Sequence, residues 1–136
     1  MGMARKPSFD LERFFQALGD KTRLRLLSLI GDREICVCYF VEILGQPQPK
    51  ISRHLAYLRN AGVVAARRDG KWMHYRIVMP PNEGAAQVLR QVLQSLQEEK
   101  PMQKDRDRLN KACCTPEKFE TLQGAPLPIP VAPPPL

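Results

Sequence analysis

The sequence predicts one mainly helical domain with a single β-hairpin, an α+β fold class. Four segments between residues 9 and 60 place apolar residues three or four positions apart, which is the spacing of a buried helix face. Asp69-Gly70 then separates two stretches of alternating apolar and polar residues, which indicates a hairpin. Three helices, a tight break, a fourth helix and a hairpin are the order of a winged helix-turn-helix.

The first two helices follow each other closely along the chain. An apolar stripe from Leu11 to Leu18 predicts the first helix, and Gly19 ends it. Asp20 is a suitable N-cap for the second helix, whose buried side comes from the apolar residues of Leu24–Ile30.

A sharp break separates the third and fourth helices. We expect the third helix over Ile35–Leu44 and the break at Gly45-Gln46-Pro47. Pro49 fits the first turn of the fourth helix, where its missing N–H costs nothing. The fourth helix has a basic, polar outward side and an apolar inward side that consists of Ile51, Leu55 and Leu58.

A two-residue turn at Asp69-Gly70 would pair Arg68 with Lys71 and Val64 with Tyr75. This register gives the hairpin an apolar face and a polar face. The apolar face would contain Val64, Ala66, Met73, Tyr75 and Ile77, and the polar face Arg67, Trp72, His74 and Arg76. We expect Trp72 to pack within the wing and His74 to lie on its surface.

The chain divides into three parts by its composition. Residues 1–8 form an N-terminal arm, residues 9–100 the folded domain, and residues 101–136 a tail with Cys113 and Cys114. The domain ends in a long helix over 82–100 with one apolar stripe, which favours a homodimer through the first and last helices over packing within one subunit. Proline dominates from Pro126 onward, so that end is expected to be extended or disordered, without a core role.

Positive charge is concentrated in the first part of the chain. The whole chain has a formal net charge of +7, and residues 80–136 contribute none of it. Between Gln46 and Arg76, basic residues outnumber acidic ones by seven to one. A basic patch beside a helix-turn-helix pattern points to double-stranded DNA as the partner, although a solvated basic surface would have the same composition.

The N-terminus lacks the apolar core of a secretory signal, and no run of residues is long enough to cross a bilayer. We therefore expect a cytoplasmic protein without a membrane partner. In a reducing compartment, four cysteines are more typical of metal ligands, redox groups or core residues than of structural disulfides.

Three motifs resemble the ArsR/SmtB metalloregulators. Residues 17–27 (ALGDKTRLRLL) are similar to that family's ALADPTRLRIL opening, residues 48–59 (QPKISRHLAYLR) to its recognition helix, and residues 34–38 (EICVC) to its arsenic-responsive box. The resemblance covers about residues 9–100. In the family's box a third cysteine often follows, but Val41 stands there. A serine commonly caps the family's recognition helix, where this chain has Pro47.

This resemblance implies a homodimeric repressor that leaves its operator DNA when trivalent arsenic binds to cysteine thiolates. It implies arsenite as the inducer, with antimonite or methylated arsenicals as alternatives, and no required cofactor. The implied DNA-facing residues are Gln48, Lys50, Ser52, Arg53 and His54 of the recognition helix, with Arg67, Arg68 and Lys71 of the wing reaching phosphates. Residues 82–100 contain no His or Asp, which argues against the zinc site of related sensors.

The thiols define a candidate site for a soft ion. Residues two apart on a regular helix point roughly 200° away from each other, so Cys36 and Cys38 would meet at one ion only if the first helical turn unwinds. Such distortion would misplace the recognition helix and release DNA. Trivalent arsenic prefers three sulfur ligands, so we expect Cys113 or Cys114 to complete the site.

Other interpretations stay open at this level. Cys36 and Cys38 would also fit as small buried residues, and Cys113 and Cys114 as idle thiols. The thiol pair would also suit a redox-sensing repressor. A thiol-dependent arsenic-handling enzyme is disfavoured, because the chain has no Cys-x-x-Cys motif, no phosphate-cradling loop and no convincing Cys/His pair.

Overall fold

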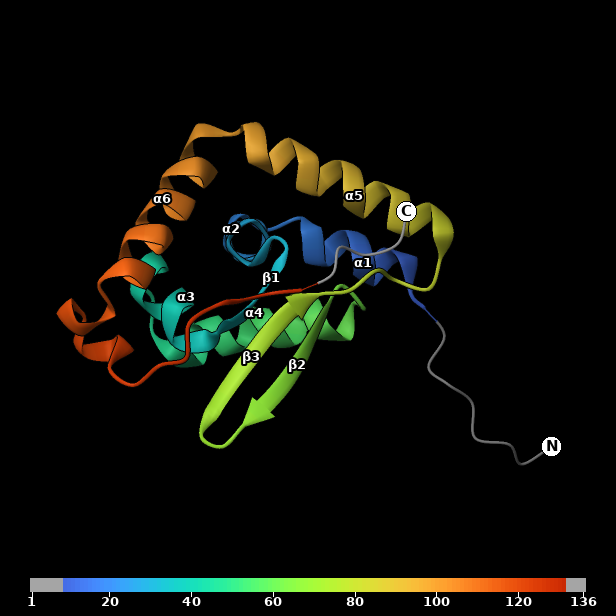
Figure 1. Cartoon of the computed structure of the whole chain (residues 1–136). Coiled ribbons are helices and arrows are strands. Elements are labelled where there is room, and N and C mark those ends of the chain that lie inside the picture. The colour runs from blue at the N-terminus through green and yellow to red at the C-terminus, as the bar shows by residue number, and fades with distance from the viewer. Residues whose placement is uncertain (1–8, 132–136) are drawn as a thin grey trace, which may run out of the picture.

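The computed structural model describes residues 9–131, so the predicted arm at residues 1–8 and the end of the predicted tail, residues 132–136, lie outside it. Figure 1 shows α5 lying over α1 and α2, α6 running down beside α2, and the hairpin projecting from the helical body. The elements in chain order are α1 (Leu11–Leu18), α2 (Lys21–Ile30), β1 (Arg33–Cys36), α3 (Val37–Leu44), α4 (Gln48–Asn60), β2 (Val64–Asp69), β3 (Trp72–Ile77), α5 (Glu83–Glu98), α6 (Lys100–Cys114), the 3-10 turns η1 (Pro116–Lys118) and η2 (Glu120–Leu122), and β4 (Ile129–Pro130).

The predicted winged helix-turn-helix is confirmed, and its first two helices begin at capping aspartates. Asp10 and Asp20 each accept a hydrogen bond from a backbone N–H three residues later, at 3.0 and 3.1 Å. The predicted inward residues of α4 are fully buried against residues of α1 and α2. This core includes Phe14, Leu26, Leu27, Ile51, Leu55 and Leu58. Burial of these stripes fixes α4 with its polar side outward.

The third helix begins two residues later in the structure than the sequence predicts. Residues Arg33–Cys36 form the strand β1, and α3 starts only at Val37. Cys36 has an extended backbone (φ −69°, ψ 142°) and pairs with His74 across β1 and β3. The sheet order is β2-β3-β1-β4, so β1 extends the wing hairpin into a larger sheet. Pairing with a distant strand overrides the local helical pattern here.

The register of the hairpin also differs from the prediction. Asp69 pairs with Trp72 and Val64 with Ile77, so the turn residues are Gly70 and Lys71. Gly70 has a φ of +61°, which is the left-handed conformation that such turns require. The shift moves the pairing by two residues, so each side chain keeps its predicted face. His74 is nevertheless buried, with 1% of its surface exposed, because β1 lies beside β3.

Within the described residues, the segment after Pro101 is folded onto the domain rather than extended as a tail. Pro101 lies in the first turn of α6, where proline is tolerated, and α6 packs on α2 and α3. Its buried face contains Met102, Asp105, Leu109 and Ala112. Leu122 of η2 is also buried, and β4 pairs with β1 through Arg33–Pro130 and Glu34–Ile129. The polar composition of α6 concealed its inward stripe.

None of the helices within residues 9–131 is long and apolar enough to span a membrane.

Candidate thiol site and nucleic-acid interface

The thiols of Cys36 and Cys38 lie together at the junction of β1 and α3. Their sulfur atoms are 3.0 Å apart, and the Cys38 thiol donates a hydrogen bond to the Cys36 sulfur. The expectation that they point apart is wrong, because Cys36 ends a strand and only Cys38 stands in the first helical turn. The pair therefore approaches one point without any unwinding of α3.

This hydrogen bond makes the two thiols unequal. Donation from Cys38, together with backbone N–H groups that include those at the start of α3, lowers the pKa of Cys36 to about 7. The pKa of Cys38 is raised, because its proton is held by Cys36 and the thiol is partly buried. The lowered pKa favours the thiolate form of Cys36, which is the form that binds a soft ion.

Cys113 is half-buried and lies close enough to Tyr39 to affect its pKa, whereas the neighbouring Cys114 is exposed. Burial raises the pKa of Tyr39 to about 12, and the charges of Cys113, Cys38 and Cys36 add to that shift. The Tyr39 hydroxyl is buried and finds no hydrogen-bond partner among residues 9–131. Three thiols thus act electrostatically on one tyrosine, although within residues 9–131 no group of three or more His, Cys, Asp or Glu side chains lies close enough together to hold a metal ion.

The predicted DNA-facing residues separate into two groups. Gln48, Lys50 and Arg53 are exposed on the outer side of α4, Ser52 is half-buried beside them, and Arg68 and Lys71 are exposed near the tip of the hairpin. All six are available to a duplex that contacts α4 and the wing.

His54 and Arg67 are engaged within the protein. The His54 Nδ1 atom is 3.3 Å from the Arg23 Nη1 atom and 3.9 Å from the Asp20 Oδ1 atom, and burial lowers the pKa of His54. Arg67 donates two hydrogen bonds to the Glu34 Oε1 atom, at 2.8 and 2.6 Å. His54 therefore braces α4 against α2, and Arg67 joins the wing to β1.

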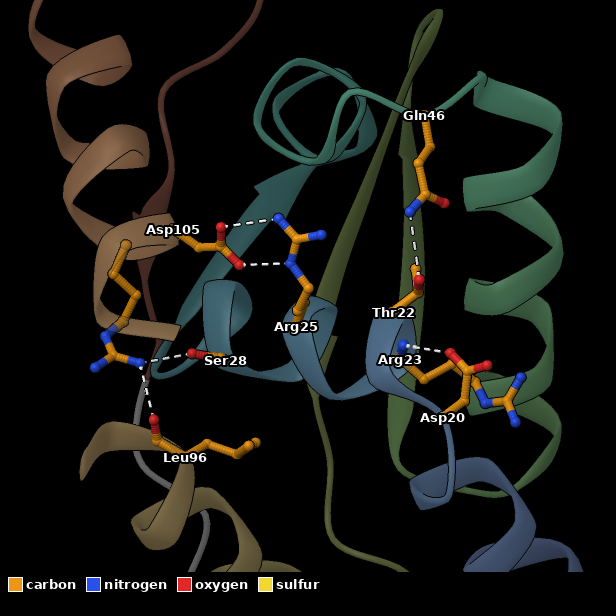
Figure 2. A network of polar contacts seen from close by, with 9 residues as sticks. Asp20, Thr22, Arg23, Arg25, Ser28, Gln46, Leu96 and Asp105 are labelled. Atoms are coloured by element: carbon orange, nitrogen blue, oxygen red, sulfur yellow. Dashed lines mark hydrogen bonds and ion pairs between the residues drawn. The ribbon is translucent and has the colours of Figure 1, made fainter. Parts of the chain in front are cut away.

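A polar network links α6 to the recognition helix through α2 (Figure 2). Asp105 accepts two hydrogen bonds from Arg25 at 2.8 and 2.9 Å, and Arg106 donates to Ser28. On the other side of α2, Gln46 donates to the Thr22 hydroxyl at 3.3 Å, immediately before α4. Helix α6, which carries Cys113, is thus held on α2, and α2 also contacts α4.

An apolar groove lies between α1, α2 and α5. It has a volume of about 620 Å³ and is lined by Leu18, Leu24, Val88, Val92 and Leu96, among others. On α1, Leu11 and Phe15 are each about half exposed, at 49% and 50%. Large exposed apolar side chains next to an apolar groove mark an interaction surface.

Sequence reasoning missed four residues that shape these sites. Glu34 and Asp105 are buried carboxylates, each bound to an arginine, and the sequence predicted neither role. His74 and Tyr39 are buried polar groups beside the thiol strand and helix. Alternation in residues 33–36 was the available signal for Glu34, because it places Glu34 and Cys36 on one sheet face.

Comparison with known proteins supports the architecture. The family model described as "Bacterial regulatory protein, arsR family" matches residues 20–66. The arsenical resistance operon repressor of Escherichia coli (strain K12) is 48% identical over 66 residues, which are 48% of this chain and 56% of that protein. The chain thus spans little more than half the length of that relative.

Longer matches come from mycobacteria. The uncharacterized HTH-type transcriptional regulator Rv0081 of Mycobacterium tuberculosis is 38% identical over 93 residues, which cover 67% of this chain and 82% of that protein. The solution structure of the homodimeric winged helix-turn-helix DNA-binding domain Mb0332 from Mycobacterium bovis has a TM-score of 0.53 at 30% identity, covering 65% of this chain and 79% of that domain. These relatives are transcriptional regulators rather than enzymes, as the sequence predicted. The chain belongs to the ArsR family of bacterial regulatory proteins.

Proposed function

We propose that this chain is a transcriptional repressor that binds operator DNA as a homodimer and releases it when trivalent arsenic binds its thiols. The observation that carries this proposal is the 3.0 Å separation of the Cys36 and Cys38 sulfur atoms at the junction of β1 and α3. One side of this junction is the sheet of the wing, and the other is the first helix of the helix-turn-helix. An ion bound there would be held by β1, which pairs with the wing strand β3, and by α3, which precedes the recognition helix α4.

The DNA-facing set is the exposed side of α4 and the tip of the wing. Gln48 and Ser52 stand in the first half of α4, where side chains of a recognition helix reach base edges in the major groove. Lys50, Arg53, Arg68 and Lys71 supply positive charge for phosphates, which makes binding strongly dependent on salt.

The partner for the groove between α1, α2 and α5 is a second copy of the chain. Leu11 and Phe15 of α1 are half-exposed, and Leu18 of the same helix lines the groove together with Val88 and Val92 of α5. Replacing Phe15 with Glu is expected to convert a dimer into a monomer in sedimentation velocity, because the charge would be buried at the interface. Replacement of exposed Gln103 on α6 with Glu is the control and leaves the dimer unchanged. A dimeric Phe15→Glu variant would contradict this assignment.

Cys113 is the proposed third sulfur ligand, from the same subunit. When arsenous acid binds three thiols, three As–S bonds form and three water molecules leave, so no oxidant is needed. Replacing Cys113 with Ser is expected to weaken arsenite binding at least about tenfold, since one of three As–S bonds is lost. The matched control is Cys114→Ser, which removes the exposed neighbour and leaves the affinity unchanged. Equal effects of the two variants would contradict this ligand set.

The function itself is tested on DNA. Duplexes bound by the full chain are selected from a random pool, and binding to the selected duplex is followed by fluorescence anisotropy. Sodium arsenite is added with a phosphine as the reductant, because dithiols would compete for arsenic. The expected result is release of DNA by the wild type and none by Cys36→Ser/Cys38→Ser. Retention of DNA by the arsenite-treated wild type would refute the proposal.

A redox-sensing repressor is the second candidate, and the same sulfur separation favours it. A peroxide would convert the two thiols to a disulfide, with two water molecules as the other product. Release of DNA by hydrogen peroxide, with no response to arsenite under the phosphine reductant, would favour this function over the first.

A further inference from the structure

Glu34 is a buried charged residue for which DNA binding and thiol chemistry give no role. Only 5% of its surface is exposed. Its Oε1 atom accepts both hydrogen bonds from Arg67 of β2, and its Oε2 atom is 3.9 Å from the Arg76 Nη1 atom of β3. One carboxylate of β1 therefore engages both strands of the wing hairpin.

The backbone attachment of the wing to β1 is short. The register of β1 and β3 contains only two residue pairs, Ile35–Tyr75 and Cys36–His74, while β2 and β3 are paired over six positions. Backbone pairing with β1 therefore involves only residues 74 and 75 of β3, and the rest of the hairpin depends on side-chain contacts for its placement. The Glu34–Arg67 pair reaches across β3 to β2 and is one of these contacts.

The thiol strand and the wing arginine also share one row of the sheet. Arg67 pairs with His74, and His74 pairs with Cys36, so these three side chains point to the same face. Glu34 lies two residues before Cys36 on that face. Both nitrogen atoms of the buried His74 ring lack a hydrogen-bond partner among residues 9–131, although the Nε2 atom lies 4.0 Å from the Asp69 Oδ2 atom. The Arg67–Glu34 pair supplies the side-chain hydrogen bonds that join β2 to β1 on this face.

We infer that Glu34 is a positioning residue for the wing. It holds Arg67 as a tether rather than leaving it as a phosphate contact, and it fixes the hairpin at the angle that DNA requires. The hydrogen bond from Arg67 keeps the pKa of Glu34 below its usual value, so the carboxylate stays charged. A further step rests on the proposed function: an ion bound at Cys36 would displace β1 and change the wing through this tether.

The direction in which one substitution changes DNA affinity distinguishes a positioning role of Glu34 from a purely electrostatic one. DNA is a polyanion, so removing a negative charge near the interface should strengthen binding if Glu34 only repels phosphates. If Glu34 positions the wing, Glu34→Gln weakens binding to the selected duplex by about tenfold, because Arg67 loses its charged partner. Circular dichroism and thermal melting establish that the variant is folded.

Arg67→Gln provides a second, more exposed change that the fold tolerates, and Arg68→Gln is its matched control. Arg68 is the adjacent exposed arginine and has no ion pair within residues 9–131. Glu34→Gln, Arg67→Gln and the double variant are expected to lose similar affinity, because the two residues act as a unit. The slope of log affinity against log salt should be unchanged in Arg67→Gln but lower by about one in Arg68→Gln.

Three results would overturn the inference: unchanged or tighter DNA binding by Glu34→Gln, additive losses in the double variant, or a reduced salt slope in Arg67→Gln. The arsenite step is measured separately as the ratio of DNA affinities with and without arsenite. This ratio should fall towards one in Glu34→Gln while arsenite still binds, as followed by arsenic–sulfur absorption. If arsenite left the DNA affinity of the wild type unchanged, only the proposed function would be refuted. The measurements without arsenite would still test the role of Glu34.

Discussion

Replacing Lys50 and Arg53 together with alanine is expected to reduce affinity for the selected duplex by about a hundredfold and to lower the salt slope by about two. Both side chains are exposed on α4, whereas the apolar side of that helix is fully buried. The fold should therefore survive the change, and the loss should reflect lost phosphate and base-edge contacts. Fluorescence anisotropy over a series of salt concentrations measures both quantities.

The matched control is Lys104→Ala/Arg108→Ala on α6. These residues are also exposed on a helix, and their replacement changes the net charge of the chain by the same amount. A large loss of DNA affinity in the α4 variant with little change in the α6 variant supports docking through α4. Similar losses in the two variants would mean that only the overall charge of the chain matters.

Replacing Asp105 with alanine is expected to destabilise the protein by about 3 kcal/mol, because the largely buried Arg25 guanidinium loses its partner. The side chains of Arg25 and Asp105 are only 23% and 6% exposed, so solvent compensates little. Such a loss lowers the melting temperature by roughly 10 °C for a domain of this size. Thermal melting by circular dichroism measures it.

Two further variants identify the cause of this loss. Asp107→Ala removes an exposed acid of the same helix and should change stability by less than about 0.5 kcal/mol. Replacing Arg25 with Met and Asp105 with Leu removes both charges and should recover most of the stability. If the double variant were as unstable as Asp105→Ala, the packing of α6 rather than the unpaired arginine would explain the effect.

The helices and the hairpin were predictable because their signals are local. Apolar spacing, N-cap residues and the Asp69-Gly70 sequence each act over a few residues, and they located α1, α2, α4, α5 and the wing, although the turn itself lies at Gly70-Lys71. The strand β1 was not predictable in this way, since it is four residues long and its partner β3 is far along the chain. Helix α6 was not predicted, because its buried face includes the charged Asp105 and its apolar spacing is therefore weak.

The cysteine site was predictable in composition but not in geometry. The positions of Cys36 and Cys38 are evident from the sequence, whereas their 3.0 Å sulfur separation depends on where β1 ends and α3 begins. Cys113 and Cys114 are neighbours in the sequence, so only the rotation of α6 on α2 and α3 distinguishes the half-buried thiol from the exposed one.

The short strand β4 determines how copies of this chain can meet. Without it, β1 would present an unpaired edge of amides and carbonyls next to the thiols, and such an edge recruits strands from other molecules. Pro130 lies in the covering strand and has no N–H to offer to a further strand, while the next amide, of Val131, already donates to the Asp32 carbonyl. The sheet therefore terminates itself on this side, and growth by strand addition is blocked there.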